Sequence, residues 1–151
     1  MSDIELPATL PGWIKDHIEL YLRDPEKGHM WDSGPLGGPG LLKTLLLTTT
    51  GRKSGKPGIL PLIYDESGDE YVIVASKGGA PAHPSWYLNL QAQPECQVQV
   101  GAKRFTATAS VAQGERRSAL WQQMATGYPP YNDYQAATDR EIPVVILTPK
   151  A

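Results

Sequence analysis

The chain has 151 residues, of which 14 are lysine or arginine and 16 are aspartate or glutamate, giving a formal net charge of -2. A chain of this length folds as one domain with a sizeable core, and its slightly acidic balance excludes a general nucleic-acid-binding protein. One cysteine excludes an intramolecular disulfide, no window approaches the ~20 apolar residues of a membrane-spanning helix, and the N-terminal segment MSDIELPATL lacks the pattern of a secretion signal. We therefore expect a cytoplasmic protein with no nucleic-acid partner.

The N-terminal segment predicts a helix followed by a linker. In WIKDHIELYLR, the residues Ile14, Ile18, Tyr21 and Leu22 recur at the spacing of one helical face. The following DSGPLGGPG, residues 32–40, has no periodicity and is typical of a loop. We expect residues 1–34 to form an amphipathic helix and linker, and residues 35–151 to form the main domain.

From residue 43 onward the chain contains short runs rich in leucine, threonine, valine and isoleucine, with turn residues between them. The first three runs predict three antiparallel strands, and pairing of the second with the third is one possibility. The next two alternate apolar and polar residues and predict a hairpin, and the last predicts a closing buried strand. The expected strands are residues 43–50, 59–64, 71–76, 96–100, 103–112 and 142–149.

Two helical patterns interrupt these strands. One is HPSWYLNLQAQP, residues 83–94, and the other is GERRSALWQQMAT, residues 114–126, in which Leu120, Trp121 and Met124 share a face. GYPPYNDYQ, residues 127–135, is expected to be a loop because of its adjacent prolines. About six short strands with a few helices predict an α+β fold built on a small antiparallel barrel.

GRKSGK, residues 51–56, raises a question because it places three cations between two glycines directly after the first expected strand. Such a turn is often only a solvated hairpin tip. A second basic corner, ASKGG at residues 75–79, follows the third expected strand, and its glycines let backbone N–H groups approach an anion. Pairing of the expected strands would bring both corners to one end of the barrel, where they would share a phosphate. No GxGxxG fingerprint follows a strand and GRKSGKPG lacks the Walker pattern, which excludes both common nucleotide motifs.

An ordered set of segments gives the chain a family resemblance: LLLTTTGRKSGKP, PLIY, VASKGGAP, HPSWYLNL, VQVG and YNDYQAATDREIPVVIL. This set, which covers residues 35 to 149, resembles the deazaflavin-dependent nitroreductase family, whose members use coenzyme F420. The resemblance implies a split β-barrel related to the flavin-binding barrels of pyridoxamine-phosphate oxidases. It also implies hydride transfer from the reduced deazaflavin to a flat conjugated acceptor such as a quinone, an enone or a nitroaromatic compound.

The resemblance implies a cofactor site made of four segments. The basic turn suits a phosphodiester and an oligoglutamate tail, because lysine and arginine hold anions by charge-assisted hydrogen bonds. The second segment, residues 61–64, would line the slot for the ring. The third, residues 75–79, would run along the phosphate and the ribityl chain, and the fourth lies on the helix HPSWYLNL. The expected residues are Arg52, Lys53, Ser54, Lys56, then Pro61, Leu62, Ile63, Tyr64, then Ala75, Ser76, Lys77, Gly78, Gly79, and finally Trp86, Tyr87 and Asn89. From the sequence alone Trp86 is equally well read as core, and Asn89 as a local hydrogen-bonding residue.

The resemblance also implies a substrate side formed by Tyr128, Tyr131, Tyr134 and Trp86. A phenol there can stack on a flat acceptor and donate a proton to the oxyanion that hydride transfer creates. Tyr131 is the first catalytic candidate, Tyr128 the second, and Ser76 would assist by hydrogen bonding. The alternative is that these tyrosines only cover one end of the barrel.

Three alternatives for function and location stay open at this point. The same barrel could bind FMN, or the protein could be a non-catalytic deazaflavin carrier. The apolar side of the first helix permits loose contact with the inner face of the cell membrane. Barrels of this type often dimerise, so a homodimer is also possible. No metal site is expected, because the three histidines and Cys96 show no ligand spacing.

Overall fold

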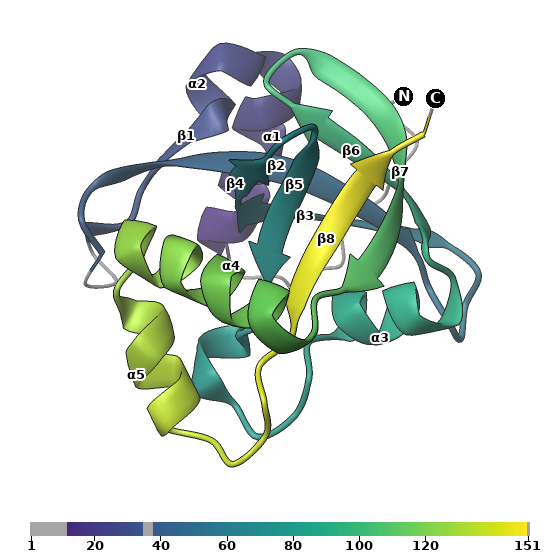
Figure 1. Cartoon of the computed structure of the whole chain (residues 1–151). Helices are drawn as coiled ribbons and strands as arrows, with labels where there is room; N and C mark the ends of the chain where they lie inside the picture. The colour runs from purple at the N-terminus through teal and green to yellow at the C-terminus, as the bar shows by residue number, and fades with distance from the viewer. Residues whose placement is uncertain (1–11, 35–37, 151) are drawn as a thin grey trace.

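An eight-stranded antiparallel sheet forms the body of the molecule, in the order β1-β2-β6-β7-β8-β5-β4, with β3 pairing β2 off this path. The computed structural model describes residues 12–34 and 38–150 (Figure 1). The strands are β1 (Met30–Asp32), β2 (Leu41–Thr50), β3 (Pro57–Ile63), β4 (Asp65–Ser67), β5 (Glu70–Val74), β6 (Glu95–Val100), β7 (Lys103–Val111) and β8 (Val144–Pro149). The helices are α1 (Gly12–Arg23), α2 (Pro25–His29), the 3-10 turn η2 (Lys77–Gly79), α3 (Ser85–Ala92), α4 (Gly114–Gly127) and α5 (Pro130–Ala136).

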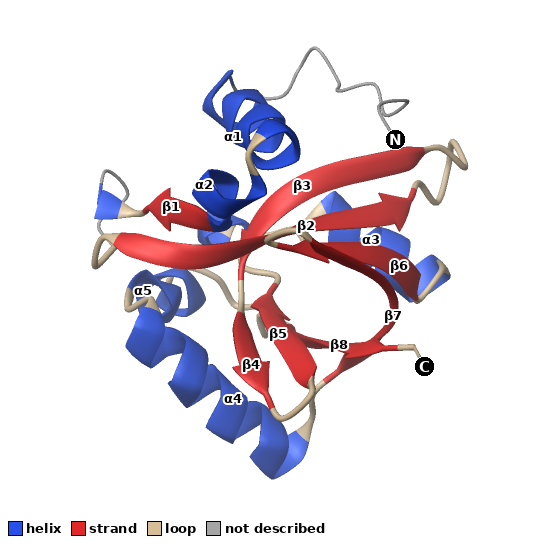
Figure 2. Cartoon of the chain, turned by 90° about the horizontal axis from the view of Figure 1, so that it is seen from above, coloured by secondary structure: helices blue, strands red, loops and turns tan. Residues whose placement is uncertain are grey.

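The sheet curls round an apolar interior, which confirms the predicted antiparallel barrel. Figure 2 shows α4 lying along β4 and β5, while α1 and α2 lie on the opposite side near β3 and β1. The interior holds the alternate side chains of the curled strands, among them Leu45, Leu47, Ile73, Val98 and Val145. None of the helices in the described part of the chain is long and apolar enough to cross a membrane.

The strands β5 and β8 are covered on both faces, which explains why their sequences are almost continuously apolar. Ile73 and Val145 point into the barrel, whereas Val72 and Ile146 belong to a second buried cluster with Leu120, Met124 and the tyrosines of α4 and α5. Burial on both faces makes this pair of strands a rigid support for the residues that follow β5.

The second and third expected strands, β3 and β5, do not pair with each other, so the pairing that would bring the two basic corners to one end of the barrel does not occur. The β2–β3 hairpin and the β6–β7 hairpin form as expected, but β5 pairs with β4 and β8. Two features explain the difference. The residues after β3 form the short strand β4, which turns back through Gly68 at a positive φ of 62°, and the C-terminal strand then inserts beside β5.

The segment 127–135 is a second correction, because it forms the end of α4 and the helix α5 rather than a loop. Two prolines stand at the start of α5, where their fixed φ suits a helix and their missing N–H has no partner to lose. The sequence prediction treated the proline pair only as a helix breaker. The consequence is that Tyr131 and Tyr134, three residues apart, project from one helical face.

The predicted N-terminal helix is confirmed as α1. Its buried residues Ile18 and Tyr21 pack against Leu46 and Ile59 on the outer side of the β2–β3 hairpin. The hydroxyl of Tyr21 donates to the carbonyl of Thr44 at 2.8 Å, so the helix is fixed to the sheet by a buried hydrogen bond as well as by apolar contacts. Of the predicted loop 32–40, Asp32 is the last residue of β1, which pairs with the start of β2, and residues 35–37 lie outside the described residues.

Candidate functional site

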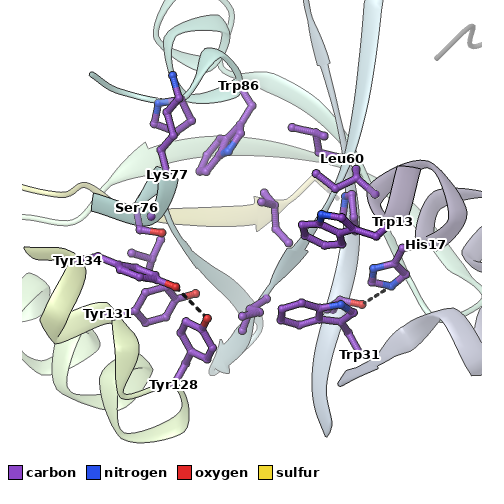
Figure 3. A pocket seen from close by; sticks show the side chains of 18 of the residues that line it. Trp13, His17, Trp31, Leu60, Ser76, Lys77, Trp86, Tyr128, Tyr131 and Tyr134 are labelled. Atoms are coloured by element: carbon purple, nitrogen blue, oxygen red, sulfur yellow. Dashed lines mark hydrogen bonds between the residues drawn. The ribbon is translucent and has the colours of Figure 1, made fainter. Parts of the chain in front are cut away.

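A cleft of about 570 Å³ opens beside the curled sheet, and three groups of side chains line it (Figure 3). The first group consists of tyrosines from the end of α4 and from α5. The second is the loop after β5 together with the start of α3, and the third comes from α1 and β1. Apolar residues of β3, Leu60 to Ile63, complete the lining. A flat apolar slot with a few polar groups at its edge is typical of a cofactor or substrate site.

The tyrosine side of the cleft is nearly closed to solvent. Tyr128 and Tyr131 pack edge to face with ring centroids 4.8 Å apart, and both are buried. The hydroxyls of Tyr128 and Tyr134 lie 3.0 Å apart and share a hydrogen bond. Burial raises the pKa of Tyr131 and of Tyr128 above the ordinary value, and the Tyr134 hydrogen bond adds to this shift for Tyr128. Both phenols therefore stay protonated at neutral pH and can act as proton donors.

The loop after β5 has the backbone geometry of an anion site. Ser76 is in the right-handed helical region, and Lys77, Gly78 and Gly79 follow with φ values of 47°, 62° and 81°. A right-handed residue followed by a left-handed one turns successive N–H groups toward a common point, the arrangement called a nest. Lys77 is the one non-glycine residue with a positive φ in the described part of the chain, and it adds a positive charge beside the nest.

The basic turn of residues 51–56 does not line the cleft but is joined to it through α3. The backbone N–H and the guanidinium of Arg52 both donate to the side-chain oxygen of Asn89, at 3.1 and 2.9 Å. The amide nitrogen of Asn89 donates in turn to Thr49 at 3.1 Å. Asn89 therefore fixes the turn to α3, whose first residues, Ser85 and Trp86, line the cleft.

The structure divides the predicted site residues into two sets. Those that line the cleft are Pro61, Leu62, Ile63, Ser76, Lys77, Gly78, Trp86, Tyr128, Tyr131 and Tyr134. Those that lie outside it are Arg52, Lys53, Ser54, Lys56, Tyr64, Ala75, Gly79, Tyr87 and Asn89.

Tyr64 and Tyr87 face the barrel interior rather than the cleft. Gly79 packs behind the nest, against α5. Trp86 fits both interpretations of the sequence, a core residue and a site residue, because it is largely buried in the core and also lines the cleft.

The sequence analysis missed the third group of side chains, Trp13, His17 and Trp31. The two tryptophan rings stack with centroids 6.0 Å apart and planes 21° apart, facing the cleft from α1 and β1 (Figure 3). His17 lies behind them and makes a 2.8 Å hydrogen bond with the carbonyl oxygen of Gly28. A signal was present in the sequence, since Trp13 is a large aromatic residue outside the predicted apolar helix face, but the recognised motifs begin only at residue 35.

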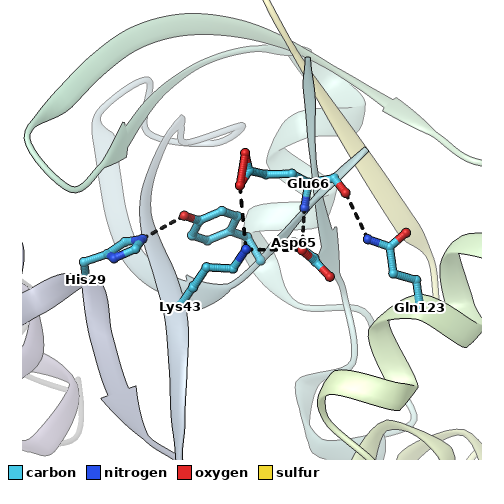
Figure 4. A network of polar contacts seen from close by, with 6 residues as sticks. His29, Lys43, Asp65, Glu66 and Gln123 are labelled. Carbon is cyan, nitrogen blue, oxygen red and sulfur yellow. Dashed lines mark hydrogen bonds and ion pairs between the residues drawn. The ribbon is translucent and has the colours of Figure 1, made fainter. Parts of the chain in front are cut away.

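A separate polar network lies away from the cleft (Figure 4). His29 and the hydroxyl of Tyr64 share a 2.7 Å hydrogen bond, and Lys43 pairs with Asp65 and Glu66 on β4. Burial, reinforced by the charge of Lys43, lowers the pKa of His29. The network joins α2, β2 and β4, so its role is structural. No group of three or more possible metal ligands occurs among residues 12–34 and 38–150.

An antiparallel split barrel with an apolar cleft, a backbone nest and a cluster of neutral tyrosines is typical of the flavin-reductase-like fold class. A family model described as F420H(2)-dependent quinone reductase matches residues 25–149, and the chain belongs to this family. It is therefore an oxidoreductase that uses coenzyme F420, which confirms the predicted family, activity class and cofactor.

Several known proteins are similar to this chain. An F420H(2)-dependent quinone reductase of Mycobacterium tuberculosis (strain H37Rv) is 41% identical over 142 residues, which cover 90% of this chain and 95% of that protein. A solved F420-H2-dependent reductase is 48% identical with a TM-score of 0.64, over 69% of this chain and 92% of the other. Another solved chain, described as a domain-swapped dimer, is 41% identical with a TM-score of 0.67, over 89% and 96%. The heme storage protein of Vibrio cholerae, 18% identical with a TM-score of 0.55 over 72% and 82%, shares the fold alone.

Proposed function

We propose that this protein reduces a quinone with F420H2, and that the acceptor lies between the tyrosine cluster and the Trp13–Trp31 pair. The observation that carries the proposal is the cleft itself. One end has a nest and Lys77, which suit an anion, while the middle is apolar and bounded by aromatic rings. A flat, neutral, conjugated molecule is the acceptor that such a middle part favours.

The residues fit coenzyme F420 in three places. The nest of residues 76–78 and the ammonium of Lys77 would hold the phosphodiester. Arg52, Lys53 and Lys56 would hold the oligoglutamate tail, since all three are exposed in the turn between β2 and β3. Pro61 to Ile63 and Trp86 would line the ring slot. When bound in its reduced form, the deazaflavin supplies a hydride.

The tyrosines would supply the proton that completes the reaction. A quinone that accepts a hydride becomes an oxyanion, and one added proton converts it to the hydroquinone. Tyr131 and Tyr128 are buried, neutral phenols at the cleft, so either can donate this proton. Tyr134 is more exposed than its two neighbours and hydrogen bonds to Tyr128, which gives a route by which the donated proton is replaced from solvent. The hydroxyl of Ser76 would assist by hydrogen bonding the acceptor or the cofactor.

We also propose a cytoplasmic protein that touches the inner face of the membrane, with a homodimer as its assembly. Trp13, Met30 and Leu41 are large apolar side chains exposed on α1, β1 and β2, and Trp13 also lines the cleft. Such side chains favour weak, peripheral contact with lipid. A similar chain described as a domain-swapped dimer supports the homodimer.

A fluorescence titration tests the cofactor assignment directly. The protein is titrated with oxidised F420 and, in parallel, with FMN, each at low and high salt. Tight binding of F420 that weakens as salt is added is expected, because the exposed cations of the basic turn are screened by salt. Stronger binding of FMN, or F420 binding that is independent of salt, contradicts the proposed role of residues 52–56.

A further inference from the structure

Arg140 lies in the segment between α5 and β8 and contacts the loop that forms the nest. Its guanidinium donates to the carbonyl oxygens of Ser76 at 2.7 Å, Ala80 at 2.9 Å and Ala75 at 3.2 Å. A further contact of 3.1 Å joins it to Nδ1 of His83, which accepts because a guanidinium can only donate. Arg140 itself does not line the cleft. One side chain therefore binds four acceptors spread over residues 75–83.

The position of Arg140 is itself fixed from α5. The side-chain amide of Gln135 donates to the carbonyl oxygen of Arg140 at 2.8 Å and accepts from the N–H of Ile142 at 2.9 Å. The loop and α5 are also in direct contact, since a Cβ on Gly79 would lie 2.7 Å from the carbonyl oxygen of Tyr134. The nest loop, Arg140 and the tyrosine helix form one connected unit.

We propose that Arg140 is a positioning residue for cofactor binding, which holds the carbonyl groups of Ala75, Ser76 and Ala80 away from the cleft and so turns the N–H groups of the nest toward it. The inference rests on the proposed binding of the cofactor phosphodiester by the nest. Arg140 would order the nest without touching either the anion or the acceptor.

The chemistry of the loop explains why an arginine is needed. Lys77 and Gly78 both have positive φ. This conformation costs energy for a residue with a side chain such as lysine, whereas glycine can adopt many other conformations as easily. The loop therefore needs external contacts to stay in one conformation. A guanidinium has five N–H donors in a rigid plane, so it can satisfy several carbonyl groups at fixed angles. A lysine at this position has one flexible ammonium and cannot reproduce this set.

The test compares Arg140→Gln and Arg140→Lys with Arg104→Gln, which removes an exposed arginine of β7 as a matched control. Two probes are used, oxidised F420 and the deazaflavin core with its ribityl chain but without the phosphate. Arg140→Gln is expected to weaken F420 binding about tenfold or more, equivalent to about 1.4 kcal/mol, and to change binding of the phosphate-free core by less than about twofold. The F420 affinity of Arg140→Lys should lie between those of Arg140→Gln and the unmodified protein, and the affinity of Arg104→Gln should equal that of the unmodified protein.

Amide hydrogen exchange of the free protein gives a second readout that needs no cofactor. In Arg140→Gln the amides of Gly79 and Ala80 should exchange at least about tenfold faster, while those of β5 and β8 stay protected. Unchanged exchange in the loop overturns the inference, and so does an equal loss of affinity for both probes. If the unmodified protein fails to bind F420, the proposed function falls, whereas the exchange result still decides whether Arg140 orders the loop.

Discussion

Tyr131 is a buried side chain of the cleft, with only 4% of its surface exposed. Its ring contacts the rings of Tyr128, Tyr134 and Trp121, so three aromatic contacts fix its position. In the proposed role, a proton donor held in this way would meet the acceptor without first losing conformational freedom.

Tyr131→Phe is expected to slow quinone reduction by about 10²-fold while F420 affinity stays within about twofold, because only the proton donor is removed. Steady-state rates with F420H2 and a soluble quinone, together with a fluorescence titration, measure both quantities. Tyr71→Phe is the matched control, since Tyr71 stacks on Phe105 away from the cleft. Unchanged turnover on every acceptor would remove the catalytic role of Tyr131 and would favour a deazaflavin carrier.

At the scale of elements, the contact between η2 and α5 links the expected cofactor side of the cleft to the tyrosines. Gly79 has a φ of 81°, and an added Cβ would come within 3.0 Å of the Tyr134 backbone. Gly78, one residue earlier, also has a positive φ, but a Cβ there would meet no atom within 4 Å. An alanine at residue 78 therefore adds backbone strain alone, whereas an alanine at residue 79 adds backbone strain and a steric clash.

Gly79→Ala should lower the free energy of unfolding by about 2 kcal/mol or more, and Gly78→Ala by about 1 kcal/mol, the cost of left-handed backbone alone. Urea unfolding of both variants measures the difference. Gly79→Ala should also shift the tyrosines and reduce the rate of quinone reduction. Equal destabilisation by the two changes would contradict the close packing of η2 on α5.

The element α1 contributes the tryptophan side of the cleft, and we propose that the predicted division at residue 34 separates an acceptor-side segment from the cofactor-binding barrel. Trp13→Ala should raise the KM for the quinone about threefold to tenfold, because an aromatic contact is lost. It should change the stability by less than about 1 kcal/mol, since half of Trp13 is exposed. Met30→Ala, which removes an exposed apolar side chain outside the cleft lining, is the control in the same kinetic assay. An unchanged KM for Trp13→Ala would exclude α1 from acceptor binding.

At the scale of the whole molecule, the sequence predicted most of the strands because their two-residue alternation and flanking turns are local signals. It failed where the outcome depends on distant segments. The pairing of β5 with β8 joins residues about seventy positions apart, and nothing in the sequence of β5 alone distinguishes β3 from β8 as its neighbour. The helix α5 was missed because the Pro129–Pro130 pair can either end a helix or begin one.

Dependence on segments that are distant in the sequence also limits what could be predicted of the site. Motif residues such as Ser76, Lys77 and Tyr131 were found because they lie in short, ordered segments that resemble a family. Arg140 lies within one of those segments, yet its contacts with residues 75–83 depend on the tertiary fold and could not be inferred from its neighbours. Trp13 and Trp31 become neighbours only after α1 docks on the sheet.

The two histidines that hold parts of the fold together make stability depend on pH. Burial lowers the pKa of His83, and the nearby charge of Arg140 lowers it further; burial and Lys43 do the same for His29. A histidine of the unfolded chain binds a proton near pH 6.5, whereas these two resist protonation in the folded protein. The unfolded state therefore binds more protons as the pH falls below about 6.5, and the folded state loses relative stability.

Urea unfolding at pH 7.5, 6.5 and 5.5 should give a free energy of unfolding that is highest at pH 7.5 and falls at each step. The double variant His29→Asn, His83→Asn should be less stable at pH 7.5 but show a flatter dependence over the same range. Below about pH 4.5 a second decline is expected in both proteins, because hydrogen bonds from Thr148 and Arg116 lower the pKa of Glu70. A stability that rises between pH 7.5 and 5.5 would mean that the two histidines gain protons on folding, which the donation from Arg140 to Nδ1 of His83 does not allow.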